Sequence, residues 1–396
     1  MIRLFFVCIF FSLINLVQAD EYYVENFGEI TFNGSFFGED FSSSNISNSA
    51  RFLNINPKLY IENNGLNYNL DIIIKSLSND NDLYFDIKEA NINFSIGDYD
   101  LLIGNSIEFW GKTDSFNLVD IINSKNFDEG LVNPIKMGEF MIKSTSELGI
   151  GNLSLYYLPI FRKNIYPSNN SRLSFSSNPD NETASYSNGA SNGIHQFALR
   201  WDGYYDDFDF GFSAFSGNSR DPSFSQLNSL LHPTYTKIEQ YGFEIQQTLS
   251  NIILKSEIIS RYGQPNKSGN IQSYQAAVIG LEKTFYIFLN NNLDLTSMIE
   301  FTKDSRGLSS HNANQNDIFL INRVVFNDLQ DSSISSILSN DLNTNTGSFI
   351  INFSRRYFNS LKAEFGIFSP INLNKDNHLS SISNDINLNF NLTWAW

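Results

Sequence analysis

The last eleven residues of the chain alternate apolar and polar side chains without a break. One set is Ile386, Leu388, Phe390, Leu392, Trp394 and Trp396, and the other is Asn387, Asn389, Asn391, Thr393 and Ala395. Successive side chains of a β-strand point to opposite faces, so this pattern predicts a strand with one apolar and one polar face. Such a strand is either half-buried in a soluble β-sandwich or part of a barrel wall that turns its apolar face to lipid.

The same alternation recurs along most of the chain. Two examples are the apolar sets Leu66, Tyr68, Leu70, Ile72, Ile74 and Tyr241, Phe243, Ile245, Leu249, each opposite mainly polar residues. The 36 Phe and 18 Tyr residues also favour strands. After the N-terminal segment there is no long apolar run, and the mean hydropathy is -0.22. Alternating strands escape a hydropathy window, so this value does not exclude a transmembrane barrel.

The connections between alternating runs follow a short–long rhythm. Short links lie at 63–65, 97–98, 148–151, 205–207, near Asn251, around Phe288, around Asp328 and at 358–359. Longer polar links lie at 38–48, 78–82, 111–138, 160–191, 217–233, 263–269, 304–317, 340–347 and 370–381. Outer-membrane barrels alternate short turns on one rim with longer loops on the other. We therefore predict an all-β fold, a transmembrane antiparallel up-and-down barrel of about 18 strands, with 16 as the alternative.

Within this scheme the first strand is expected at Ile30 to Phe37. In the strand before Gly97 the apolar phase shifts between Ile87 and Ala90, which predicts a β-bulge near Lys88. We find no linker or second domain, so one barrel domain covers residues 20–396.

The first 19 residues have the organisation of a signal peptide. Arg3 precedes a mostly apolar stretch from Leu4 to Val17, and Ala19 supplies the small residue of a cleavage site. The stretch is too short for a spanning helix, so we expect export and cleavage before Asp20. The only cysteine, Cys8, lies inside it, which leaves the mature chain without a thiol. A net charge of -16 argues against nucleic acid as a partner.

The long link after Trp110 holds the most informative residues. Asp114 and Ser115 can cap a short helix, whose one side would carry Leu118, Ile121 and Ile122. An apolar helical face must be buried. The loop either folds into the barrel and narrows its lumen or packs over the rim. As constriction-loop candidates we take Trp110, Lys112, Asp114, Phe116, Leu118, Asp120, Ile121 and Asn123.

At these residues the chain resembles known families. Leu101 to Asn123 resembles the Leu-x-x-Gly-x-x-x-x-x-Trp-Gly-x-x-Asp pattern, with its following hydrophobic-Asp-x-x-Asn element, of several porin-like outer-membrane families. Residues 157–162, 197–201, 219–222 and 277–285 are similar to uncharacterised proteobacterial barrels, so the resemblance covers most of the mature chain. It departs from the family at Ser124, where a Pro usually follows the Asn. The alternate aromatics before a terminal Trp resemble the C-terminal assembly signal of outer-membrane barrels, carried here by Phe390, Leu392, Trp394 and Trp396.

Charged residues on the polar face of the strands are candidates for the pore lining, because a charge in a narrow lumen acts on a passing ion with little screening. By strand phase this set is Glu108, Arg200, Glu244, Lys255, Glu257, Arg261, Glu282, Glu300, Arg323, Arg356, Lys362 and Glu364. Both signs are present, so no ion selectivity follows. The same residues could instead pair across strands and hold the wall together.

Catalysis and metal binding find little support. His195, His232, His311 and His378 all map to the outer rim or outer loops, and no spacing of His, Cys or carboxylates matches a zinc or calcium site. We expect no enzyme, no cofactor and no metal.

The expected function is a porin-like channel in the bacterial outer membrane for diffusion or export of small polar or amphiphilic solutes. The expected partners are outer-membrane lipid, the barrel-assembly machinery and the solutes, and the oligomeric state stays open. The alternative is a closed barrel that serves as a scaffold, an adhesin or a surface binding platform.

Overall fold

The structure, a computed structural model, describes residues 22–38, 48–77, 83–128, 134–167, 179–227, 230–290, 292–310, 314–372 and 386–396. The first nine wall strands are β1 (Tyr23–Phe37), β2 (Ser49–Asn63), β3 (Leu66–Leu77), β4 (Leu83–Ile96), β5 (Tyr99–Ser106), β8 (Glu139–Leu148), β9 (Gly151–Leu158), β11 (Gln196–Tyr205) and β12 (Phe208–Asn218). The other nine are β14 (Leu230–Leu249), β15 (Ile252–Pro265), β16 (Ile271–Phe285), β17 (Asp294–Asp304), β18 (Asp317–Val325), β19 (Ser333–Asp341), β20 (Gly347–Tyr357), β21 (Leu361–Ile371) and β22 (Asn387–Ala395).

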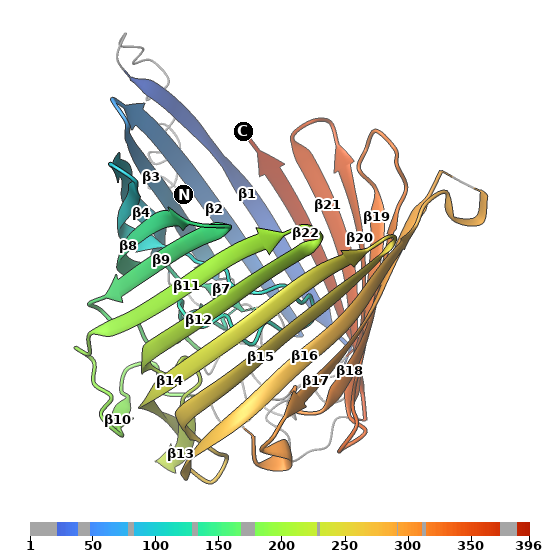
Figure 1. The fold of residues 1–396 in the computed structure, drawn as a ribbon. Coiled ribbons are helices and arrows are strands. Elements are labelled where there is room, and N and C mark those ends of the chain that lie inside the picture. Colours follow the sequence, from blue (N-terminus) through green and yellow to red (C-terminus); the bar gives the residue numbers. More distant parts are fainter. Residues whose placement is uncertain are drawn as a thin grey trace.

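These strands form one closed antiparallel barrel of 18 strands, as predicted. Each wall strand pairs with the next along the chain, and β1 closes the cylinder on β22 with Thr31 opposite Thr393 and Asn33 opposite Asn391 (Figure 1). The first strand begins at Tyr23 and not at Ile30, because β2 extends far enough to pair with it as far as Glu62.

The rhythm of the connections separates two rims. Short turns such as Asn64–Gly65 and Gly97–Asp98 lie on the rim where β22 ends, and the longer connections lie on the other. Two predicted loops hold strands of their own. In 217–233, β13 (Ser223–Leu227) pairs with an extended β14, and in 160–191, β10 (Ser185–Ser187) joins β14 in parallel. These strands project beyond the wall at the lower edge of Figure 1.

The bulge predicted near Lys88 is present. The pairing of β3 with β4 runs from Asp71 opposite Glu89 to Ile72 opposite Ile87, so Lys88 is the extra residue. Among the described residues, no helix is long and apolar enough to cross a membrane. Helical turns in the described chain are the short 3-10 segments η2 (Phe288–Asn290) and η3 (Gly307–Ser309).

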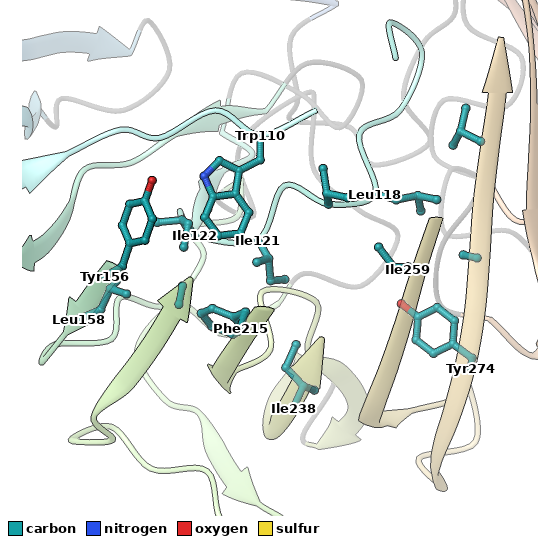
Figure 2. Packing of buried hydrophobic residues seen from close by; sticks show 14 of the residues in the cluster. Trp110, Leu118, Ile121, Ile122, Tyr156, Leu158, Phe215, Ile238, Ile259 and Tyr274 are labelled. Atoms are coloured by element: carbon teal, nitrogen blue, oxygen red, sulfur yellow. The ribbon is translucent and has the colours of Figure 1, made fainter. Parts of the chain in front are cut away.

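The two faces of the wall differ as the alternation predicts. Outward positions expose large apolar side chains such as Phe197, Ile258 and Phe365. The principal buried apolar cluster lies inside the cylinder, between the strands from β8 to β16 and the segment that follows Trp110 (Figure 2). The barrel therefore packs an apolar core within its own lumen, on one side.

Candidate functional site

The segment between β5 and β8 lies against the inner wall of the barrel. Trp110, Val119, Ile121 and Ile122 are each at most 2% exposed. They pack on inward-facing residues of seven strands, among them Met141, Tyr156, Leu158, Ala198, Phe215, Ile238, Ile259 and Val278 (Figure 2). We call residues 107–128 the inward loop. Its end pairs, through β6 (Lys125–Asn126), with β7 (Ile135–Lys136).

Glu257 on β15 is the main polar anchor of the inward loop. Its Oε1 accepts hydrogen bonds from the backbone N–H groups of Lys112 at 2.8 Å and Thr113 at 3.0 Å, and from the Thr113 hydroxyl at 2.8 Å. Its Oε2 accepts from the N–H groups of Leu118 at 2.7 Å and Val119 at 3.3 Å. One buried carboxylate thus satisfies the backbone on both sides of a bend.

A second carboxylate, Glu300 on β17, extends this arrangement. It accepts hydrogen bonds from the N–H groups of Asp114 at 2.9 Å and Ser115 at 2.7 Å, and from the Ser115 hydroxyl. Lys255 on β15 completes the contact, with Nζ 2.6 Å from the Asp114 carboxylate and 2.7 Å from Glu282. The charges under the loop are therefore paired or hydrogen-bonded to it.

The prediction of a helix after Asp114 is wrong. Residues 111–124 form a series of bends without a helical turn. The physical reason is that the wall carboxylates Glu257 and Glu300 take the N–H groups that a helix would direct to carbonyls of its own preceding turn. The apolar residues Leu118, Ile121 and Ile122 are buried all the same, because the wall supplies their partners.

Two glycines allow the close approach of loop and wall. Gly111 has a φ of +136°, and a Cβ there would lie 2.7 Å from Asn117 Cγ and 2.8 Å from Glu257 Oε1. Gly242 on β14 leaves room for Val119, whose Cγ1 would be 2.9 Å from an added Cβ. The Trp-Gly pair of the recognised motif therefore has a direct steric explanation.

Arg220 holds the inward loop from the outer rim. Its Nε and Nη2 donate to the Ile122 carbonyl at 3.0 and 2.6 Å, and its Nη1 donates to Gln196 Oε1 at 2.8 Å. The guanidinium also faces the Phe161 and Phe215 rings. Strand alternation could not identify this residue as part of the site, because it lies in a connection. Its only sequence signal is the Ser219 to Pro222 segment.

The ends of the inward loop are tied by side chains that the sequence singled out. Asn123 accepts from the Glu108 N–H at 2.8 Å and donates to the carbonyls of Ser106 and Met137 at 2.9 Å. Asp120 pairs with Lys136 at 2.5 Å. Glu108 lies 3.0 Å from Lys143, a partner that sequence reasoning missed.

The remaining predicted pore-lining charges fall into two groups. Arg200 pairs with Glu244 and Asp202 and lies over the Trp110 ring, and Arg261 donates to Gln240 at 2.8 Å and to Asp221 at 2.9 Å. These residues lie near the inward loop. The second group is Arg323 on β18, Arg356 on β20, and Lys362 and Glu364 on β21. Lys362 and Glu364 pair at 2.7 Å, and Arg356 lies 3.9 Å from Asp331.

The wall opposite the inward loop has a different lining. On β22, β1, β2 and β3 the inward positions near the middle of the strands carry amides and hydroxyls, and these side chains are half-exposed. They are Asn389, Asn391, Thr393, Thr31, Asn33, Ser35, Asn54 and Asn69. We call them the amide wall. Their exposure contrasts with the loop side, where Glu257, Glu300 and Val278 are at most 1% exposed. The inward loop thus covers one side of the lumen, and the half-exposed lining occupies part of the other side, where Phe52, Asp71 and Lys75 are buried.

The aromatic residues of the predicted assembly signal lie on the outer face near the seam. Trp394 and Trp396 are 46% and 37% exposed, with ring centroids 5.7 Å apart. Phe390 is half-buried against Phe365 and helps to line a hollow of about 470 Å³ on this face.

Two histidines lie in the described chain, both toward the outer rim. His195 contacts the Tyr157 hydroxyl at 2.6 Å, and His232 lies 2.8 Å from the Ser185 hydroxyl and 3.2 Å from that of Thr183. His311, His378 and the signal segment 1–19 fall outside the described residues. In the part of the chain that the structure describes, no group of three or more His, Cys, Asp or Glu residues could hold a metal ion.

The barrel is similar in fold to solved outer-membrane proteins. OpdQ of Pseudomonas aeruginosa matches with a TM-score of 0.55 and 9% identity, over 95% of this chain and 97% of that chain. Wzi, an Escherichia coli outer-membrane protein involved in group 1 capsule assembly and a carbohydrate-binding β-barrel, matches with a TM-score of 0.53 and 10% identity, over 92% and 83%. A triple mutant of Rhodopseudomonas blastica porin has a TM-score of 0.46 and 8% identity, over 94% and 100%.

No protein-family model matches the sequence, and no curated protein matches it. At identities this low the likeness concerns the fold. The chain has the fold of a porin-like outer-membrane barrel.

Proposed function

We propose that this protein is a channel of the bacterial outer membrane, through which small polar or amphiphilic solutes diffuse. Residues 1–19 direct export and are removed, and the C-terminal strand is read during barrel assembly. The inward loop, residues 107–128, lies largely within the predicted inward-folding segment 111–138 and narrows the lumen. The channel carries out no catalytic step and needs no cofactor.

One observation carries this proposal: the inward side chains on the two sides of the interior differ in how far they are covered. The inward loop is buried against β8 to β17, whereas the amide wall on β22 to β3 keeps its polar side chains half-exposed. A loop that occupied the whole cross-section would bury both sides. Polar side chains along an unfilled lumen are what a water-filled pore requires.

The alternative, a closed barrel that serves as a scaffold, an adhesin or a binding platform, differs in one measurable property. The refolded protein in a planar bilayer should give steady single-channel openings. Deleting residues 116–123 should raise the conductance, because the lumen would widen where the loop now lies. If the refolded barrel does not conduct ions, the channel proposal is wrong and the closed-barrel alternative remains.

The deletion also removes packed apolar residues and so endangers folding. Glu257→Ala with Glu300→Ala releases the loop without shortening it, and should also raise the conductance or its noise. Ile258→Ala, on the outward face beside Glu257, is the matched control and should leave the conductance unchanged. Heat-modifiable gel mobility checks that each variant is folded.

A further inference from the structure

On β22, β1 and β2 the amide wall forms uncharged hydrogen-bonding rungs across the strands that close the barrel, and on β3 the residue opposite Asn54 is Lys75. Between β1 and β22, the hydroxyls of Thr31 and Thr393 are 3.1 Å apart, Asn33 donates to Asn391 at 2.9 Å, and Ser35 donates to Asn389 at 2.7 Å. Asn54 continues the middle rung onto β2, with a bond of 3.0 Å to Asn33.

Further uncharged pairs lie on strands to either side of this set, beyond charged residues of β21 and β3. On β3 and β4, Asn69 donates to Asn91 at 3.0 Å, and Asn93 donates to the same residue at 2.8 Å. On β19 and β20, hydroxyl pairs lie at 3.0 and 2.8 Å; these are Ser333 with Ser354 and Ser339 with Ser348. A broad part of the lumen thus presents neutral donors and acceptors.

Charges flank this wall: Glu29 is the next inward residue of β1 before Thr31, and others are paired with residues of opposite sign. Lys362 and Glu364 on β21 pair at 2.7 Å, and Lys58 on β2 lies 3.4 Å from Asp71. On the far side of the lumen, Glu257 and Glu300 are buried beneath the inward loop and bonded to its backbone. A solute at the rungs between β22 and β2 therefore meets amides and hydroxyls.

Such a lining treats neutral and charged solutes differently. Each amide has two donor hydrogens and two acceptor lone pairs, so an amide within a rung keeps capacity for a solute. A hydroxyl-rich solute can exchange its hydrogen bonds to water for hydrogen bonds to successive rungs. These bonds are individually weak and recur along the wall, as conduction requires. An ion that sheds water among the rungs themselves finds no charged side chain on them in return.

We propose that the amide wall is a passage for uncharged polyhydroxylated solutes, that is, sugars and sugar alcohols, and that it favours them over charged solutes of the same size. The inference rests on the proposed channel function and names its solute class. It is drawn from the rungs of this chain.

Proteoliposomes that hold the full-length mature protein provide the test. Permeation is compared for glucose, gluconate and glucosamine, which have similar size and are neutral, anionic and cationic. We expect glucose to enter several-fold faster than both charged solutes. An open pore that passes gluconate or glucosamine as fast as glucose overturns this inference alone. A barrel without KCl conductance overturns the channel proposal as well.

Variants of one rung connect the preference to named residues. Asn33→Leu with Asn391→Leu removes the rung without adding a charge and should reduce the advantage of glucose. Asn33→Ser is the milder variant, in case the double variant does not fold, and should reduce it less. Phe32→Leu, on the outward face of the same strand, is the control. An unchanged ratio of glucose to gluconate in both rung variants contradicts the proposal.

Discussion

Glu257 accepts two hydrogen bonds from Thr113, one from its backbone N–H at 3.0 Å and one from its hydroxyl at 2.8 Å. The two residues are 144 positions apart in the sequence. This double contact fixes the bend of the inward loop against β15, and Lys112, Leu118 and Val119 bond to the same carboxylate.

Glu257→Ala should loosen the inward loop. The substitution leaves buried donors of the loop without an acceptor, at a cost of about 3 kcal/mol or more in the free energy of unfolding. The measurement is urea unfolding in lipid vesicles. Glu364→Gln, another inward carboxylate without contact to the loop, is the control and should cost less than about 1 kcal/mol. Equal losses for the two variants would contradict the anchoring role of Glu257.

Gly111→Ala should destabilise the start of the loop by about 1–3 kcal/mol, because a Cβ meets Asn117 and Glu257 and the φ of +136° disfavours any other residue. Gly149→Ala is a suitable comparison, because Gly149 has a φ of +62° but no atom within 4 Å of an added Cβ. Protease cleavage at Lys112 or Lys125 should rise in the first variant only. Increased cleavage in both would assign the effect to backbone strain in general.

The seam of the barrel should show measurable coupling between Asn33 and Asn391, whose amides are 2.9 Å apart. In a double-mutant cycle with both residues changed to Ala, we expect a coupling free energy of about 0.5–1.5 kcal/mol. The unfolding free energy in lipid vesicles provides the readout. Strictly additive losses would mean that the rung contributes nothing to closure.

The turn between β18 and β19 should open in acid. Bonds of 2.8 Å from the backbone N–H and the hydroxyl of Ser332 hold the pKa of Asp328 below its ordinary value of 3.8, and Arg355 lies 3.3 Å away. A lowered pKa means that the turn is stabilised above pH 3.8 and loses this contribution as the pH falls through the value in the folded protein. An NMR titration of the Ser332 amide should have its midpoint below pH 3.8. Asp328→Asn should abolish that titration.

Much of the fold could be predicted from the sequence, because lipid outside and water or packed protein inside force a period of two on each strand. The alternation from Ile386 to Trp396 therefore located β22, and the break in phase after Ile87 located the bulge at Lys88. The register between β1 and β22 was not predictable. The pairing of Asn33 with Asn391 depends on how the whole sheet closes into a barrel.

The loop was harder to predict for a related reason. Its residues Leu118, Ile121 and Ile122 showed that an apolar surface must be buried, but spacing alone suggested a helix. The competing acceptors, Glu257 and Glu300, lie on strands far along the chain. Arg220 gave no signal of its contact with Ile122, because a connection has no fixed periodicity.

The off-centre position of the inward loop gives one cylinder two kinds of interior, which should respond to mutation by different rules. Beneath Trp110 and Ile122, loss of a methylene group should leave a void and lower stability, as in a water-soluble globular protein. Along Asn33 and Asn391 a change of side chain meets solvent, so its main effect should be on what passes and at what rate. Selection for folding stability and selection for permeability would then act on separate sets of residues within a single sheet.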